Sequence, residues 1–202
     1  LWVGHPMIDL TKKLPLKKDA RTILNLRSNQ NILLLMPASR PQELRYVLPT
    51  FMKAAKKLQQ KYPSLVVYIP SCRSSFDEIF KKAFRKYQVK GHVISQKDSA
   101  KLKPYIYSLT KIAFCKSGTV NMELALYGIP QIVGYRVSRV TAFIAKKILN
   151  FKVRFISPVN LLVNKLIIPE FVQKEFDEKK IFYKSCRTVS YTHLTLPTIH
   201  RV

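Results

Sequence analysis

The residues with the clearest chemical potential lie in one short segment, from Lys116 to Pro130. Ser117-Gly118-Thr119 forms a small-residue turn after an apolar stretch, and Glu123 follows about one helical turn into the pattern after it. A glycine turn that opens a helix leaves main-chain N–H groups unpaired at the positive end of the helix dipole, which favours a phosphate. A carboxylate one turn further on could accept hydrogen bonds from ribose hydroxyl groups. The segment therefore suits a nucleotide diphosphate, although an ordinary turn with Ser117 as a helix cap and Glu123 in solvent fits it equally well.

A second turn carries a cation that could serve the same ligand. The apolar run 31–36 is followed by Pro37-Ala38-Ser39-Arg40-Pro41, and a helical pattern begins directly afterwards. Arg40 at this position could reach an anionic group, because its guanidinium forms paired hydrogen bonds with phosphate or carboxylate oxygens. A surface ion pair explains Arg40 equally well when this segment is considered alone.

The elements that must position these turns alternate along the chain. Short apolar strands are expected at 31–36, 65–69, 92–94, 112–115 and 131–134, and helices at 42–62, 76–87, 101–109, 119–127, 141–149 and 175–185. Strands that alternate with helices at this spacing predict an α/β fold with a doubly wound parallel sheet. Ligands of such sheets bind at the carboxyl ends of the strands, where both turns lie.

The charge of the chain restricts its partners. Lysine and arginine number 36 against 11 acidic residues, which gives a net charge of +25 and favours nucleic acid, anionic lipid or phosphorylated substrates. The helix expected at 141–149 is apolar with two adjacent lysines, so it suits either an anionic lipid surface or a packed core. The sequence lacks an arginine-rich tail, zinc-ligand spacing and an aromatic RNA-binding signature, so specific nucleic-acid binding is not expected. Its three cysteines fit neither a disulfide framework nor a metal site, which favours a reducing compartment.

Several motifs occur in an order that identifies a family. They are Gly4-His5-Pro6, Leu35-Met36-Pro37-Ala38-Ser39-Arg40 with Glu43, Ser117-Gly118-Thr119 through Glu123, Val133-Gly134-Tyr135-Arg136, and Ile156-Ser157-Pro158-Val159-Asn160-Leu161-Leu162 with Pro169-Glu170. Together they resemble the lipid-A-disaccharide synthases, glycosyltransferase family 19. The residues within the motifs look closest to the cyanobacterial and algal branch of that family. The resemblance covers residues 3–181.

The resemblance implies a GT-B glycosyltransferase, which has two Rossmann-like domains and an active site in the cleft between them. This chain is similar to the carboxyl-terminal, nucleotide-sugar-binding half. Residues 1–30 would form the inter-domain connection and the start of the domain, 31–187 the Rossmann-like UDP-sugar domain, and 188–202 a non-native tail. The catalytic base would lie in the absent amino-terminal half, so this fragment alone is not expected to turn over.

The implied reaction transfers 2,3-diacylglucosamine from UDP-2,3-diacylglucosamine to 2,3-diacylglucosamine 1-phosphate and releases UDP, with no metal or organic cofactor. By resemblance, Ser117, Gly118 and Thr119 would hold the diphosphate and Glu123 the ribose. Arg40 would stabilise negative charge on the departing UDP. The donor pocket would be completed by Ser39, Tyr135, Arg136 and Asn160.

One departure from the family concerns the turn before Arg40. The commoner family turn is Pro-Gly-Ser-Arg, and Ala38 replaces its glycine here, which disfavours a backbone with positive φ.

The resemblance also implies partners and a location. The partners would be the two acylated sugars and an anionic membrane, contacted peripherally, and a homodimer is left open. The enzyme would lie on the cytoplasmic face of the inner membrane in a bacterium, or in a plastid or mitochondrion in an alga. The alternatives are another GT-B UDP-sugar enzyme, either a MurG-like transferase or a UDP-N-acetylglucosamine epimerase, and a basic module that binds nucleic acid or anionic lipid without catalysis.

Overall fold

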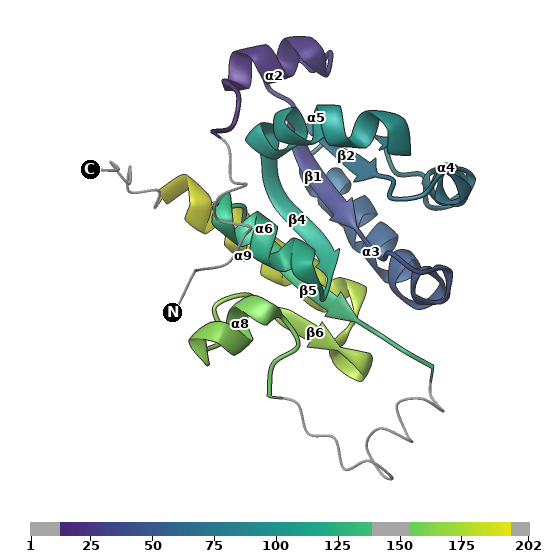
Figure 1. The fold of residues 1–202 in the computed structure, drawn as a ribbon, viewed down its shortest axis with the longest axis vertical. Coiled ribbons are helices and arrows are strands. Elements are labelled where there is room, and N and C mark those ends of the chain that lie inside the picture. Colours follow the sequence, from purple (N-terminus) through teal and green to yellow (C-terminus); the bar gives the residue numbers. More distant parts are fainter. Residues whose placement is uncertain (1–12, 139–153, 195–202) are drawn as a thin grey trace, which may run out of the picture.

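A six-stranded parallel sheet forms the centre of the molecule (Figure 1). The computed structural model describes residues 13–138 and 154–194, with side chains described to 189. The strands stand in the order β3-β2-β1-β4-β5-β6, and each neighbouring pair is parallel. Their bounds are β1 Asn31–Met36, β2 Leu65–Pro70, β3 Gly91–Ile94, β4 Thr110–Lys116, β5 Gln131–Tyr135 and β6 Glu170–Val172. The α/β prediction with a doubly wound parallel sheet is therefore confirmed.

Helices cover both faces of this sheet. On one face α3 (Pro41–Lys61) packs against α4 (Asp77–Tyr87) and α9 (Glu178–Leu194). On the other face α2 (Lys17–Ile23) packs against α5 (Gln96–Leu109), and α6 (Thr119–Leu126) against α8 (Pro158–Val163). Short 3-10 turns occupy Ser74–Phe76 and Gln173–Glu175. Within the described residues, no helix combines the length and the apolar character needed to cross a bilayer.

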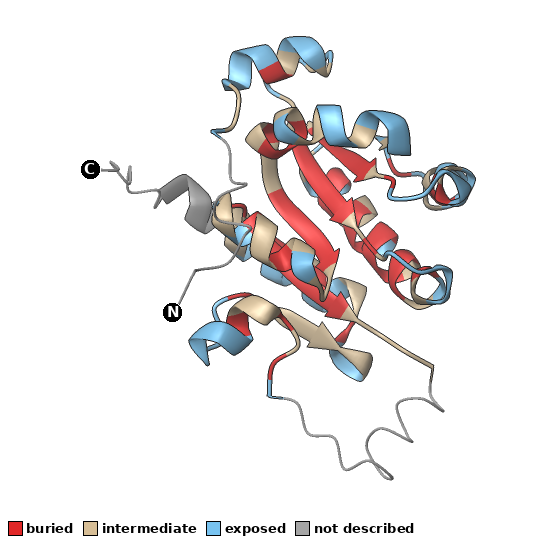
Figure 2. Ribbon diagram, in the orientation of Figure 1, coloured by how far each residue is buried: buried red, intermediate tan, exposed pale blue. Residues whose placement is uncertain are grey.

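The alternation of side chains along β1 explains why the sheet needs two covers. Leu33 and Leu35 belong to the core under α3, whereas Ile32 and Leu34 belong to the core under α5, and all four are fully buried. A strand buried on both faces reads as a continuous apolar run, which is why this strand was visible in the sequence. Figure 2 shows the buried strands between helices whose outer surfaces are exposed.

The observed elements include the five predicted strands, but helices α2 and α8 and strand β6 were not predicted from the sequence, and two helix bounds differ. Helix α5 begins at Gln96 rather than 101, because the Ser95 side chain caps it by accepting from the Asp98 N–H at 3.3 Å. Helix α9 continues to Leu194, into the stretch 188–202 that the sequence analysis assigns to a non-native tail. The Gly4-His5-Pro6 motif and the helix expected at 141–149 lie outside the described residues.

Candidate functional site

The order of the strands reverses between β1 and β4. The chain builds outward from β1 to β3 and then returns to place β4 on the other side of β1. In doubly wound sheets the crevice beyond the carboxyl ends of the strands at this reversal is the usual ligand site. Met36 at the end of β1 pairs with Cys115 near the end of β4. The structure thus brings the Ser39-Arg40 loop and the Ser117-Gly118-Thr119 turn, which the sequence predicted separately, to adjacent strand ends.

An ion pair joins these two strand ends. Lys116 Nζ, at the end of β4, lies 2.5 Å from Glu43 Oε1 in the first turn of α3, and the two side chains are 19% and 16% exposed. The same ammonium lies 5.8 Å from the centre of the Tyr135 ring at the end of β5. Within the described residues, the other carboxylate oxygen of Glu43 is buried without a hydrogen-bond partner. Sequence reasoning included Glu43 and Lys116 in motifs but gave neither a role in the site.

The turn between β4 and α6 is held by its own side chains. Asn121 is fully buried, and its Oδ1 accepts from the Gly118 N–H at 3.0 Å while its Nδ2 donates to Lys116 O at 3.2 Å. The hydroxyl of Ser117 donates to Ile156 O. Because Asn121 uses the Gly118 N–H, the N–H groups of Thr119 and Val120 are the ones that helix geometry leaves for a ligand.

Gly118 leaves space beside this turn rather than permitting an unusual backbone. Its φ of 164° is extended, which any residue can adopt. A Cβ at this position would meet no atom within 4 Å. The main chain of the turn is therefore approachable from this side.

Behind the turn, Asn160 and Glu170 hold the segment whose Ile156 carbonyl accepts the hydrogen bond from Ser117. The Glu170 carboxylate accepts from the Ile156 and Ser157 N–H groups at 2.7 and 2.8 Å and from Asn160 Nδ2 at 2.7 Å. Asn160 also donates to Ile168 O at 2.7 Å, and its Oδ1 accepts from the N–H groups of Ile167 and Ile168. Asn160 was expected to line the donor pocket. The structure buries it completely and occupies both ends of its amide, so its place is behind the site.

The neighbouring residues Tyr135 and Arg136, at the end of β5, were both expected in the donor pocket but lie in different places. Tyr135 lies at the crevice beside Lys116. The Arg136 guanidinium donates to Gln173 O at 3.1 Å and to Phe176 O, and it lies over the Phe176 ring. Arg136 therefore ties β5 to the segment that leads into α9.

The loop after β1 holds its polar side chains outward. Ser39 and Arg40 are exposed, and neither side chain caps α3. Among the described residues, the Arg40 guanidinium has no hydrogen bond or ion pair, so it stands available for an anion. Ala38 does not adopt positive φ, and it packs against the core beneath α3. At the end of β2, exposed Cys72 places its sulfur 3.9 Å from Ala38 O.

Glu123 lies on the side of α6 that faces α5. Its Oε1 pairs with Lys103 Nζ at 2.6 Å, a partner that the sequence did not indicate. Thr119, at the first turn of the same helix, is exposed. Among the residues that the structure describes, no group of three or more His, Cys, Asp or Glu side chains could hold a metal ion.

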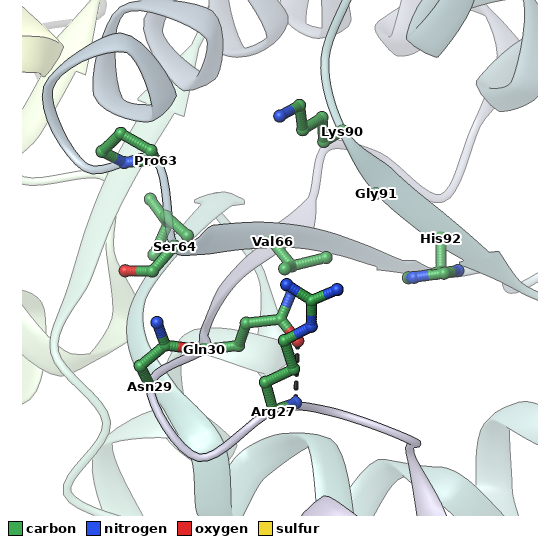
Figure 3. Close-up of a pocket in the computed structure, with 10 residues that line it drawn as sticks. Arg27, Asn29, Gln30, Pro63, Ser64, Val66, Lys90, Gly91 and His92 are labelled. Carbon is green, nitrogen blue, oxygen red and sulfur yellow. Dashed lines mark hydrogen bonds between the residues drawn. The ribbon is translucent and has the colours of Figure 1, made fainter.

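A hollow lies at the opposite edge of the sheet (Figure 3). It has a volume of about 690 Å³ and is bounded by Arg27 and Gln30 before β1, Ser64 before β2, and Lys90 to His92 at the start of β3. These are the amino ends of the strands, so this hollow is separate from the crevice at the carboxyl ends.

Comparison with known proteins gives one family. The model described as lipid-A-disaccharide synthetase matches residues 1–194. A lipid-A-disaccharide synthase of Prochlorococcus marinus (strain MIT 9313) is 49% identical over 174 residues, covering 86% of this chain and 44% of that protein. Another, of Gloeothece citriformis (strain PCC 7424), is 36% identical over 184 residues, covering 91% and 47%. The chain thus spans about half the length of the curated relatives it matches, and the cyanobacterial-like branch expected from the motifs is confirmed.

Solved structures confirm the fold. The Escherichia coli ADP-heptose lipopolysaccharide heptosyltransferase II superimposes with a TM-score of 0.60 at 9% identity, covering 96% of this chain and 54% of that one. The lipopolysaccharide glycosyltransferase WaaG gives a TM-score of 0.58 at 12% identity, with coverages of 94% and 46%. Both are GT-B glycosyltransferases, and this chain corresponds to about half of each.

Proposed function

Because this chain belongs to the lipid-A-disaccharide synthase family, we propose that it forms the UDP-sugar-binding half of such an enzyme. The whole enzyme would transfer 2,3-diacylglucosamine from its UDP donor to 2,3-diacylglucosamine 1-phosphate and release UDP. The observation that carries the proposal is the convergence of the Arg40 loop and the Ser117-Gly118-Thr119 turn at the reversal of strand order.

Each part of the donor has a candidate partner at this crevice. The diphosphate would lie at the start of α6, against Ser117, Gly118 and the N–H groups of Thr119 and Val120. Arg40, exposed and without a partner among the described residues, would stabilise negative charge on UDP as it departs. Glu123 would accept from the ribose hydroxyls.

The remaining residues divide into contacts and supports. Ser39 and Tyr135 lie at the crevice and would complete the donor pocket. We assign Arg136 and Asn160 to the support of the site, since their polar groups are bonded to main-chain atoms.

The partners of the whole enzyme follow from this reaction. Both substrates carry acyl chains, so the enzyme would contact an anionic membrane peripherally, and the net charge of +25 favours such a surface. In a bacterium this would be the cytoplasmic face of the inner membrane, and in an alga a plastid or mitochondrial membrane. A homodimer is compatible with the proposal.

Calorimetric titration of the 202-residue chain with UDP and UMP tests the donor site. We expect UDP to bind at roughly micromolar to millimolar Kd, and UMP more weakly by about tenfold, because it lacks one charged phosphate contact. A cooperative thermal unfolding transition of the same sample controls for folding. A folded chain that binds neither nucleotide contradicts a donor site in this half.

The acylated substrate requires the full-length enzyme. In an assay with a full-length relative that carries this half, we expect turnover of acylated UDP-glucosamine and none of the unacylated sugar. Equal turnover of both donors would assign the chain to another UDP-sugar reaction.

A further inference from the structure

We infer that Lys103, on α5, is a positioning residue that orients Glu123 for the ribose of the donor and so sets the preference for ribose over 2′-deoxyribose. This inference rests on the proposed function, since it assumes that Glu123 contacts the ribose. Sequence analysis left α5 out of the site entirely, and the contact appears only in the folded chain.

The geometry fixes one end of the Glu123 carboxylate. Lys103 Nζ lies 2.6 Å from Glu123 Oε1, and the two side chains are 34% and 23% exposed. This pair joins two helices rather than neighbouring turns of one helix. Because both side chains are partly shielded, the pair is better able to hold a single arrangement than a fully exposed surface pair.

An aromatic ring fixes the position of the ammonium in turn. Lys103 Nζ lies 5.6 Å from the centre of the Tyr107 ring, one turn further along α5. Tyr107 is only 2% exposed, and its ring meets Tyr127 edge-on, with centroids 5.4 Å apart. Tyr127 ends α6, the helix that carries Glu123. The ammonium therefore lies on a packed surface that belongs to both helices.

The Tyr107 hydroxyl is a further buried polar group near this pair. Within the described residues it has no hydrogen-bond partner. Its pKa is raised, first by burial and then by the charge of Glu123, so the hydroxyl keeps its proton. A protonated hydroxyl near a carboxylate is an available hydrogen-bond donor.

This arrangement suits a ribose for two reasons. A carboxylate accepts through both oxygens, so a Lys103 contact at Oε1 leaves Oε2 for a sugar hydroxyl. Glu123 must also hold its negative charge near a diphosphate, which is itself negative. The Lys103 cation offsets that repulsion, so the carboxylate can face the ribose.

The test compares UDP with 2′-deoxy-UDP by calorimetry on the 202-residue chain and on Lys103→Met. Removing the 2′-hydroxyl removes one hydrogen bond to a charged acceptor, so we expect the unsubstituted chain to prefer UDP by about tenfold. In Lys103→Met we expect this ratio to fall toward one, mainly through weaker UDP binding. Lys101→Met, an exposed position on the same helix, serves as the matched control and should keep the ratio.

A conservative variant separates orientation from folding. Lys103→Arg keeps the cation, so it should retain a ratio of several-fold, and thermal unfolding confirms that each variant is folded. Should Lys103→Met retain the full ratio, or weaken both ligands equally, the positioning role is overturned while the UDP site stands. A folded unsubstituted chain that binds both nucleotides equally overturns the ribose contact of Glu123 and this inference with it. Absence of UDP binding by that chain overturns the proposed function as well.

Discussion

The two loops that meet at the reversal of strand order differ in how firmly they are held. The turn after β4 is fixed by Asn121, by the Ser117 hydroxyl bond to Ile156 O, and by Glu170 behind that segment. The loop after β1 leaves Ser39 and Arg40 exposed, with no side-chain cap on α3. A pre-formed turn lowers the cost of ordering a site around a diphosphate, whereas an open cation can adjust as the leaving group gains charge. In the proposed enzyme the turn after β4 would therefore bind the diphosphate, and the loop after β1 would adjust as charge develops on the leaving group.

The largest expected effect comes from Asn160→Ala, which removes hydrogen bonds from the segment behind the turn after β4. Loss of the amide leaves the N–H groups of Ile167 and Ile168 and the Ile168 carbonyl without their buried partner. We expect the free energy of unfolding to fall by about 2–4 kcal/mol, measured by urea denaturation. Gln60→Ala, at an exposed position of α3, should change it by less than about 0.5 kcal/mol. Unchanged stability with lost UDP affinity would return Asn160 to the donor pocket.

Arg40→Ala tests the loop after β1, residues 37–40, which we call the open loop because Ser39 and Arg40 are exposed there. Because the guanidinium has no partner among the described residues, its removal should leave stability within about 0.5 kcal/mol. UDP affinity should fall by about 1–3 kcal/mol, the usual cost of a lost charged hydrogen bond, as measured by calorimetry. Arg45→Ala, at an exposed position of α3 directly after this loop, is the control and should bind UDP normally. Normal UDP affinity in Arg40→Ala would remove Arg40 from the ground-state site.

Ala38→Gly probes whether the open loop depends on backbone freedom, and its expected effect is the smallest. Ala38 does not adopt positive φ, so glycine gains nothing in the folded state and makes the unfolded chain more flexible. We expect a loss of about 0.5–1 kcal/mol in the free energy of unfolding, and UDP affinity within about twofold of the original. Tighter UDP binding by the glycine variant would show that the loop must reach a conformation that alanine restricts.

The sequence predicted the fold because its signals are local. Continuous apolar runs such as Ile32 to Leu35 are typical of strands buried on both faces. Small-residue turns follow β1 and β4, the two strands at the reversal of strand order. Two turns at one edge of a parallel sheet were then enough to place the candidate site. The start of α5 was missed by several residues because the cap at Ser95 precedes the apolar part of that helix.

Local sequence patterns could not predict the side-chain contacts between different helices and strands. The pairs Lys116–Glu43 and Lys103–Glu123 each join residues from different helices or strands, and their distances depend on packing that no spacing rule contains. Asn160 and Arg136 were carried over as donor contacts from a family motif. A motif shows that a residue type recurs, but not whether its polar atoms face a ligand or a neighbouring carbonyl.

Cys72 gives the open loop a native attachment point for a spectroscopic probe. Its exposed sulfur lies 3.9 Å from Ala38 O, two residues from Arg40. Cys115 is buried, and burial raises the pKa of its thiol to about 12, so it should resist alkylation at neutral pH. With Cys186 replaced by serine, a maleimide fluorophore would therefore attach at Cys72 alone among the cysteines. Its emission during a stopped-flow mix with UDP would report how fast that loop responds to nucleotide.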